Sequence, residues 1–288
     1  LRRFLFFMKK VISQSVHNTG AFSKKVVIAY FLLLSLWWMS IYVRGLYEGT
    51  ENNAFTLIYP WMSLFGGLIG IGIAKKWGGL KSYFGASLVY FSLGLLAQFF
   101  GQFIYAILIY IVGVDPYPSI GDVGYYGSAI FYIAGALKLL KVVSPSWKKH
   151  LNAGTLLTMI FIPLGMLFFS YEFFLRGYEF GSMPWITMVL DFAYPLTQAI
   201  YVSLAIGIFV ASRKMLGGIM RIPTLFLLAA LVVQYICDFM FLYQSSQETW
   251  YVAGPNDYLY FLAYCAMTLA IIQVGHTYSH ITASHTKE

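Results

Sequence analysis

Long apolar segments, separated by short charged breaks, constrain this chain more than any other feature. Each segment reaches the roughly 20 residues that an α-helix needs to cross a bilayer. We expect helices because an open sheet leaves backbone groups unpaired in hydrocarbon, and the segments are too long for barrel strands. The pattern predicts an all-α integral membrane protein with eight transmembrane helices: 26–46, 55–74, 83–112, 119–143, 154–175, 185–212, 222–245 and 257–275.

Composition agrees with a membrane protein and excludes several other classes. Only 10% of the 288 residues are charged and 59% are hydrophobic, whereas about a quarter of a soluble domain is charged. Together with only two cysteines, this excludes a soluble enzyme, a nucleic-acid-binding domain and a disulfide scaffold. The lipid bilayer is the expected partner, and nucleic acid is not.

The distribution of charge predicts the orientation. With the N-terminus inside, all but Arg44 and Arg176 of the 19 Lys and Arg residues fall on the inner side, as the positive-inside rule requires. We therefore expect a multi-pass protein of the cell membrane with both termini cytoplasmic. Most acids fall on the outer side, namely Glu48, Glu51, Asp115, Asp122, Glu172, Glu179, Glu248 and Asp257.

An internal repeat is the most specific signal in the sequence. An offset of 135 residues aligns Tyr59 with Tyr194 and Asp122 with Asp257, and the run LLAQFFGQF aligns with LVVQYICDF one position further on. Because each half has an even number of spans, the two halves point the same way across the bilayer.

The repeat divides the chain into two tandem four-helix units in parallel orientation. The predicted segments are a basic flank (1–25), the first repeat (26–143), a cytoplasmic linker (144–153), the second repeat (154–275) and a cytoplasmic tail (276–288).

Asp191 and Asp238 lie inside predicted spans, each roughly 10 Å below the outer interface. Their counterparts in the first repeat are Thr56 and Gln102, which are uncharged. Carboxylates within a membrane are costly, usually face the bundle interior and mark functional sites. We expect both in one outer-half cavity that binds a ligand. The alternative is that each is hydrogen-bonded to neighbours and serves only packing.

Asp122 and Asp257 are further candidate ligand-binding residues at helix starts. Local capping is the alternative, since Ser119 to Asp122 matches a capping box and Asn256 matches an N-cap.

The remaining candidates are tyrosines, glutamines and arginines. Tyr59 and Tyr194 each precede a proline and either line a cavity or pack at a bend. Gln98 and Gln234 are expected to form interhelical hydrogen bonds. Arg44 and Arg176 either pair with outer acids or anchor the helix ends at the interface.

Sequence motifs indicate no enzyme. The chain has no zinc-protease, nucleophile-elbow, phosphate-loop or dinucleotide motif. No catalytic or metal-binding residue is predicted, and no cofactor is indicated.

The segment Asp-Pro-Tyr-Pro-Ser-Ile-Gly-Asp-Val-Gly-Tyr-Tyr (115–126) resembles the Pro-x-Pro-Ser-x-(Ala/Gly)-Asp-x-x-Tyr signature of multi-helix membrane sensor regions. Such regions precede diguanylate cyclase and histidine kinase domains. The segments 190–195 and 256–260 resemble recurring Asp and Tyr landmarks of the same regions. The resemblance implies an input module, here without an output domain after Gly275.

Three functions remain open. The first is a sensor or receptor-like module that binds a small or lipidic ligand in an outward-facing aromatic and acidic cavity. The second is a proton- or cation-coupled transporter or channel that uses Asp191 and Asp238. The third is a structural subunit of a membrane complex. A homodimer or a membrane-protein partner is compatible with each of them. The acidic outer face favours a cationic or neutral ligand that enters from outside.

Overall fold

The computed structural model describes residues 2–114, 117–143, 153–176, 184–215 and 220–284. Within these ranges the secondary structure is helical, in the order α1 (Arg2–Val43), α2 (Thr50–Ile58), α3 (Trp61–Lys76), α4 (Tyr83–Ile107), α5 (Ile120–Val143), α6 (Ala153–Ser170), α7 (Trp185–Met215), α8 (Arg221–Ser246) and α9 (Pro255–Ser284). A short 3₁₀ helix, η1 (Gly79–Lys81), precedes α4, and π-helical turns, η2 (Leu108–Val112) and η4 (Tyr171–Leu175), extend α4 and α6.

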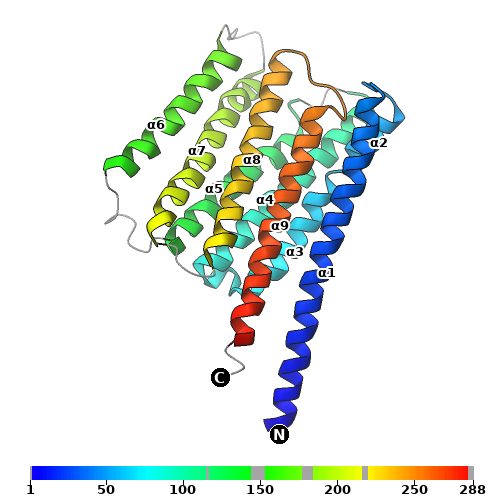
Figure 1. Cartoon of the computed structure of the whole chain (residues 1–288). Coiled ribbons are helices and arrows are strands. Elements are labelled where there is room, and N and C mark those ends of the chain that lie inside the picture. The colour runs from blue at the N-terminus through cyan, green and yellow to red at the C-terminus, as the bar shows by residue number, and fades with distance from the viewer. Residues whose placement is uncertain (1, 115–116, 144–152, 177–183, 216–219, 285–288) are drawn as a thin grey trace.

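Among the described residues, seven helical segments are long and apolar enough to cross a membrane, which indicates a multi-pass membrane protein. Of the eight predicted spans, the one at 154–175 is represented by the shorter apolar helix Ile160–Leu175. The helices alternate in direction, so α1 begins and α9 ends at the same end of the bundle (Figure 1). We call the opposite end, which holds the loop between α1 and α2 and the loop between α8 and α9, the outer end.

The boundaries of the helices differ from the predicted segments in three places. Helix α1 runs through the basic flank from residue 2, and α9 continues past 275 into the predicted tail. The linker at 144–152 and the end of the tail at 285–288 lie outside the described residues. The span predicted at 55–74 is divided into α2 and α3 at Tyr59 and Pro60, because proline lacks the N–H that would continue the helical hydrogen bonds.

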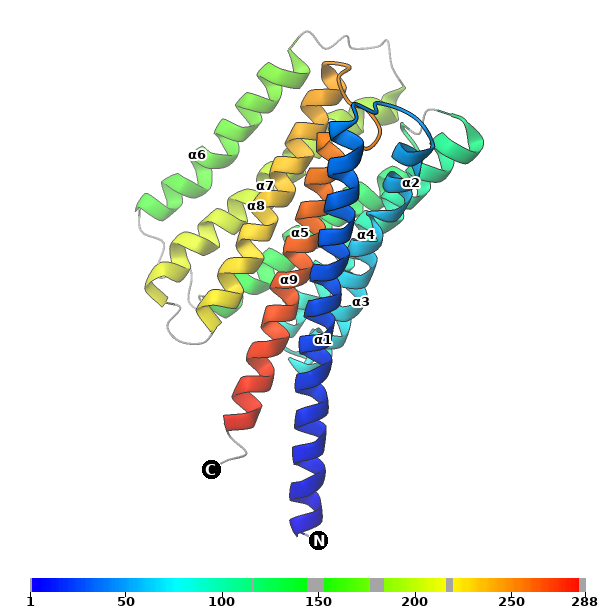
Figure 2. The same ribbon diagram turned by 45° about the vertical axis from the view of Figure 1, so that its right-hand side comes forward.

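Six helices form a closed ring. In the order α3, α4, α5, α7, α8, α9, each helix contacts the next. Helix α9 in turn contacts α3, which closes the ring. Helix α1 packs on α9 and α6 packs on α7, so both lie outside this ring (Figure 2). Large apolar side chains on the outward faces of α1 and α6 are exposed, for example Leu33 and Phe161. Such surfaces are stable against lipid and not against water.

Glycines allow α4 and α5 to approach closely. A Cβ on Gly124 of α5 would lie 2.6 Å from the carbonyl oxygen of Ala97 and 2.6 Å from the amide nitrogen of Gly101, both in α4. Small residues at such positions let helix backbones pack against each other in membranes. This contact fixes the outer half of α4 against the start of α5, where Asp122 lies.

Candidate functional site

Three carboxylates are buried among the described residues: Asp122, Asp238 and Asp257, each at most 9% exposed. Their described hydrogen bonds come from hydroxyl and amide groups and not from Lys or Arg. A buried carboxylate is tolerated only when such donors replace its lost water. Tyrosine hydroxyls supply four of these eight hydrogen bonds, at Asp122 and Asp238, and Asp257 is held by a threonine hydroxyl and a backbone N–H.

Asp122 lies in the first turn of α5. The backbone N–H of Ser119 donates to its Oδ2 at 2.7 Å, which confirms the predicted capping box. Its Oδ1 accepts from Tyr105 of the outer half of α4 at 2.9 Å and from Tyr194 of α7 at 2.8 Å. Asp122 thus has a second role beyond capping, since it joins three helices.

Asp257 occupies the corresponding place in α9. Its Oδ2 accepts from the backbone N–H of Ala253 at 2.7 Å and from the hydroxyl of Thr56 in α2 at 3.3 Å. The prediction that Asn256 is an N-cap is wrong. Helix α9 begins at Pro255, a residue suited to the first helical position, and the Asn256 amide donates to the carbonyl of Cys237 at 3.0 Å.

Asp238 lies in α8 and receives three hydrogen bonds. Tyr201 of α7 donates at 2.6 Å, Tyr260 of α9 at 3.0 Å and Gln234 of α8 itself at 2.9 Å. The interhelical bond predicted for Gln234 is therefore replaced by one within α8. Residues four apart share a helix face, and a carboxylate is a stronger acceptor than a neutral group.

Gln98 forms the predicted interhelical hydrogen bonds. Its amide donates to Ser128 of α5 at 2.8 Å, and its oxygen accepts from Tyr264 of α9 at 3.0 Å. This pair of bonds crosses the ring from α4 to α9. Gln102, one turn further along α4, is also buried.

Asp191 differs from the other carboxylates because it is only half-buried. It accepts from the hydroxyl of Tyr117, in the loop before α5, at 2.5 Å. The hydrogen bonds described for Asp191 and Asp238 go to different residues, so a single cavity shared by the two stays a prediction.

Tyr59 and Tyr194, paired by the repeat, lie in different surroundings. Tyr59 is fully buried and its ring packs on Phe55 at 5.5 Å and on Tyr264 at 6.3 Å. Within the described part of the chain its hydroxyl has no hydrogen-bond partner. Tyr59 therefore packs at the bend between α2 and α3, whereas Tyr194 donates to a carboxylate.

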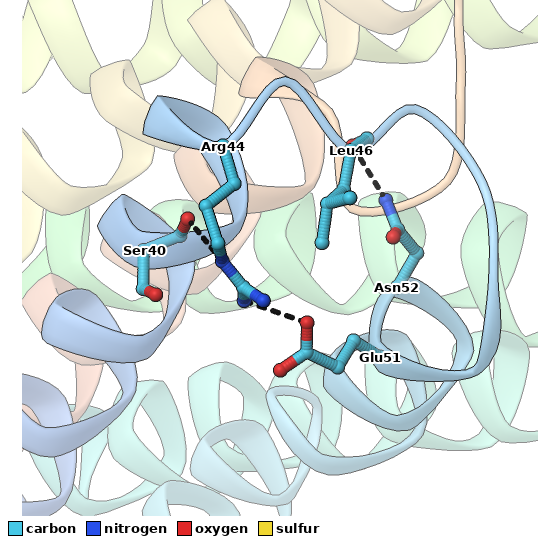
Figure 3. Close-up of polar contacts among 5 residues, drawn as sticks. All are labelled: Ser40, Arg44, Leu46, Glu51 and Asn52. Carbon is cyan, nitrogen blue, oxygen red and sulfur yellow. Dashed lines mark hydrogen bonds and ion pairs between the residues drawn. The ribbon is translucent and has the colours of Figure 1, made fainter.

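Arg44 and Arg176 each form an ion pair with an acid close in sequence. The distance is 2.6 Å from Arg44 to Glu51 and 2.8 Å from Arg176 to Glu172, and both arginines are exposed. Figure 3 shows the Arg44 side chain between two acceptors, the carbonyl oxygen of Ser40 and the carboxylate of Glu51 in α2. Exposed pairs of this kind contribute about 0–1 kcal/mol.

Of the phenols that hold the carboxylates, the sequence singled out Tyr194 and Tyr260 but not Tyr105, Tyr117 or Tyr201. These three are among 23 tyrosines, so composition could not select them. Spacing was the available signal for Tyr201, which lies seven residues after Tyr194 and thus on the same face of α7.

The arrangement supplies hydroxyl and amide donors to buried carboxylates. Within the described ranges, no group of three or more His, Cys, Asp or Glu side chains gathers as a metal site would require. Comparison of the chain with protein families, with curated proteins and with solved structures yields no significant match.

Proposed function

We propose that the chain is a membrane sensor module with eight spans and both termini on the cytoplasmic side of a cell membrane. In this proposal the repeats 26–143 and 154–275 are parallel and related by a twofold axis along the membrane normal. A small or lipidic ligand at the outer end changes the packing between them. A homodimer or another membrane protein receives the signal.

The contacts around the helix ring support the repeat. The repeat pairs α3 with α7, α4 with α8 and α5 with α9. Under this pairing, the contact between α3 and α9 corresponds to the contact between α7 and α5. The contacts of α4 with α3 and α5 correspond to those of α8 with α7 and α9. An arrangement in which the halves exchange equivalent contacts is expected of parallel repeats. Helices α1 and α6 depart from this pattern, since α1 packs on α9 and α6 on α7.

The observation that carries the sensor proposal is a pair of hydrogen bonds between the halves near the outer end. Tyr194 in the second half donates to Asp122 in the first, and Thr56 in the first half donates to Asp257 in the second. Bonds from hydroxyls to carboxylates are strong where water is excluded. A ligand that moves either helix start therefore changes the free energy of the interface between the halves.

Spin labels on the inner loops test this coupling. We place them at Lys81→Cys and Arg221→Cys, two exposed positions in different halves, after replacing the buried Cys237 and Cys265 by Ala. Distances are measured by double electron–electron resonance in nanodiscs with choline, monovalent and divalent cations, and lipids of defined headgroup as probes.

We expect at least one probe to shift the distance distribution, and Tyr194→Phe to remove that shift because it breaks a bond between the halves. Tyr201→Phe is the matched control, since it removes a phenol hydroxyl whose bond joins α7 to α8 within one half. Unchanged distances with every probe, or equal effects of the two variants, would contradict the sensor proposal.

Proton-coupled transport is the second candidate, and the Asp238 cluster favours it. A carboxylate within a span and held by two phenols is a suitable proton carrier. In liposomes loaded with a pH-sensitive dye, a transporter gives proton flux that Asp238→Asn abolishes. A sensor gives no flux with either protein.

A further inference from the structure

A small pocket lies at the outer end, where α1 meets the loop that leads into α9. It has a volume of about 290 Å³ and is lined by Tyr42, Tyr47 and Tyr251 together with Leu46, Ala253 and Pro255. None of the tyrosines that the sequence predicted as cavity residues lines it. Pockets for small ligands start at about this volume, which suits an occupant of only a few heavy atoms.

Three of the residues that line this pocket are tyrosines, Tyr42, Tyr47 and Tyr251, and we call this group the aromatic cage. The rings of Tyr47 and Tyr251 meet edge to face at 5.2 Å. Tyr42 stacks on Trp38 at 5.1 Å, and Trp38 stacks in turn on Tyr258 at 4.2 Å. The cage is thus supported from behind by packed rings, while Tyr42 and Tyr47 remain 52% and 66% exposed.

The charges around the cage are compatible with a cation. Arg44, the nearest basic residue in the sequence, is neutralised by Glu51 at 2.6 Å (Figure 3). On the far side of the loop, the N–H of Ala253 donates to the carboxylate of Asp257. Partial burial, followed by the neighbouring phenols of Tyr47 and Tyr42 and by the negative charge of Asp257, raises the pKa of Tyr251, so its phenol stays neutral at physiological pH.

The cage is connected to the site described above. The carbonyl of Ala253 accepts a hydrogen bond from the indole of Trp38 at 2.9 Å. The backbone N–H of Ala253 donates to the carboxylate of Asp257. Asp257 in turn accepts from Thr56 of the other half. A ligand that orders the rings of the cage therefore acts, through one residue, on a hydrogen bond between the halves.

We propose that this cage binds an organic ammonium cation, held by cation–π attraction to Tyr42, Tyr47 and Tyr251. Neutral aromatic rings attract a methylated ammonium strongly because its dehydration costs little. The proposal names the ligand class of the sensor module and rests on the proposed function for its signalling role. The same chemistry is presented by a free amine and by a lipid headgroup.

Calorimetric titration of the full chain with choline tests the site. The comparison ligand is 3,3-dimethyl-1-butanol, which has the shape of choline without its charge. The protein is kept in nanodiscs of phosphatidylglycerol, which has no ammonium group. We expect choline to bind at least about tenfold more tightly than the neutral alcohol, since cation–π attraction is absent from the latter.

Variants of Tyr251 test whether choline binding depends on the aromatic ring or only on the bulk of the side chain. Tyr251→Leu is expected to weaken choline binding at least about tenfold, while Tyr251→Phe keeps the ring and stays within about threefold of the native chain. Tyr171→Leu is the control, because it makes the same substitution at a tyrosine that lies outside the cage. Equal affinity for choline and the alcohol, no binding of choline, or an unaltered affinity in Tyr251→Leu would each overturn the proposal.

Nanodiscs of phosphatidylcholine distinguish the two sources of the cation. These titrations are run at 1 M NaCl, because the anionic surface of phosphatidylglycerol otherwise concentrates choline whether or not the cage binds it. If choline affinity then falls in phosphatidylcholine nanodiscs relative to phosphatidylglycerol, the lipid headgroup competes for the cage and is its occupant. If the affinity is unchanged, the ligand is a free ammonium compound. Choline binding together with spin-label distances that no probe changes would overturn the sensor function and leave the site. A distance change with another probe, in a chain that does not bind choline, would overturn the site and leave the sensor.

Discussion

The contact between α4 and α5 leads to a sharp prediction about two glycines of the same helix. We expect Gly124→Ala to destabilise the protein and Gly127→Ala to leave it equally or more stable. The two substitutions add the same methyl group to α5. They differ in the atoms that surround the added methyl group.

At Gly124 the new Cβ would lie 2.6 Å from the Ala97 oxygen, 2.6 Å from the Gly101 nitrogen and 2.9 Å from the Gly101 Cα. These are backbone atoms, so no side-chain rotation relieves the overlap. Ordinary contact begins at 3.4 Å, so the helices must separate by about 0.8 Å in a close-packed interior. At Gly127 nothing lies within 4 Å of the added atom.

Overpacking a core costs about 1–3 kcal/mol, and a rigid backbone contact belongs at the upper end of that range. Replacing a helical glycine by alanine stabilises the helix by about 1 kcal/mol, because alanine has the higher helix propensity. The expected net change in the free energy of unfolding is therefore a loss of about 2 kcal/mol for Gly124→Ala. For Gly127→Ala it is a gain of about 0–1 kcal/mol.

Thermal unfolding in detergent, followed by tryptophan fluorescence, measures the difference between the two variants. Protein concentration and detergent are held constant, since both alter the apparent midpoint. If Gly124→Ala unfolds at the same temperature as Gly127→Ala or above it, α4 and α5 are not in the contact described, and the placement of Asp122 against α4 fails as well.

Three further predictions use the same unfolding assay. Asp238→Ala should lower the free energy of unfolding by about 3 kcal/mol because it leaves three buried donors without an acceptor. Asp238→Asn should lower it by less, and equal losses in the two variants would argue against the hydrogen-bonded cluster. Trp38→Phe should cost about 1 kcal/mol through the lost bond to the Ala253 carbonyl, and no loss would place the indole in solvent. Glu51→Gln should change stability by less than about 1 kcal/mol and have no effect at 1 M NaCl, because the pair with Arg44 is exposed; a larger, salt-independent loss would show that the pair is buried.

The helices could be predicted from the sequence because hydrocarbon imposes their length and composition. The seven segments that meet the length and hydropathy requirement each overlap a predicted span. The division at Pro60 could not be predicted, since Pro195 stands in the aligned position and α7 continues through it. Proline weakens a helix at both places, and tertiary packing decides whether it breaks.

The candidate site was predictable in its acids and only in part in the partners of those acids. Intramembrane carboxylates are rare, so Asp238 was conspicuous in the sequence, whereas a tyrosine is not conspicuous among 23. The capping box at Asp122 followed from a local pattern. Its bond to Tyr194 joins residues 72 positions apart and depends on how α5 meets α7, which no local pattern encodes.

The outer cage escaped prediction for a different reason. Tyr42, Tyr47 and Tyr251 flank two loops and belong to the interfacial aromatic belt that any membrane protein has. Only the approach of the loop between α8 and α9 to the end of α1 distinguishes them from ordinary belt residues.

The different fates of the two aligned prolines give the halves different mechanics. In the first half the helix is interrupted between α2 and α3, at Tyr59 and Pro60. The second half has a single rod, since α7 runs unbroken from Trp185 to Met215. In the proposed sensor, an unbroken α7 that pivots within the bilayer would move its inner end opposite to its outer end. The break between α2 and α3 would let α2 move without displacing α3 to the same extent.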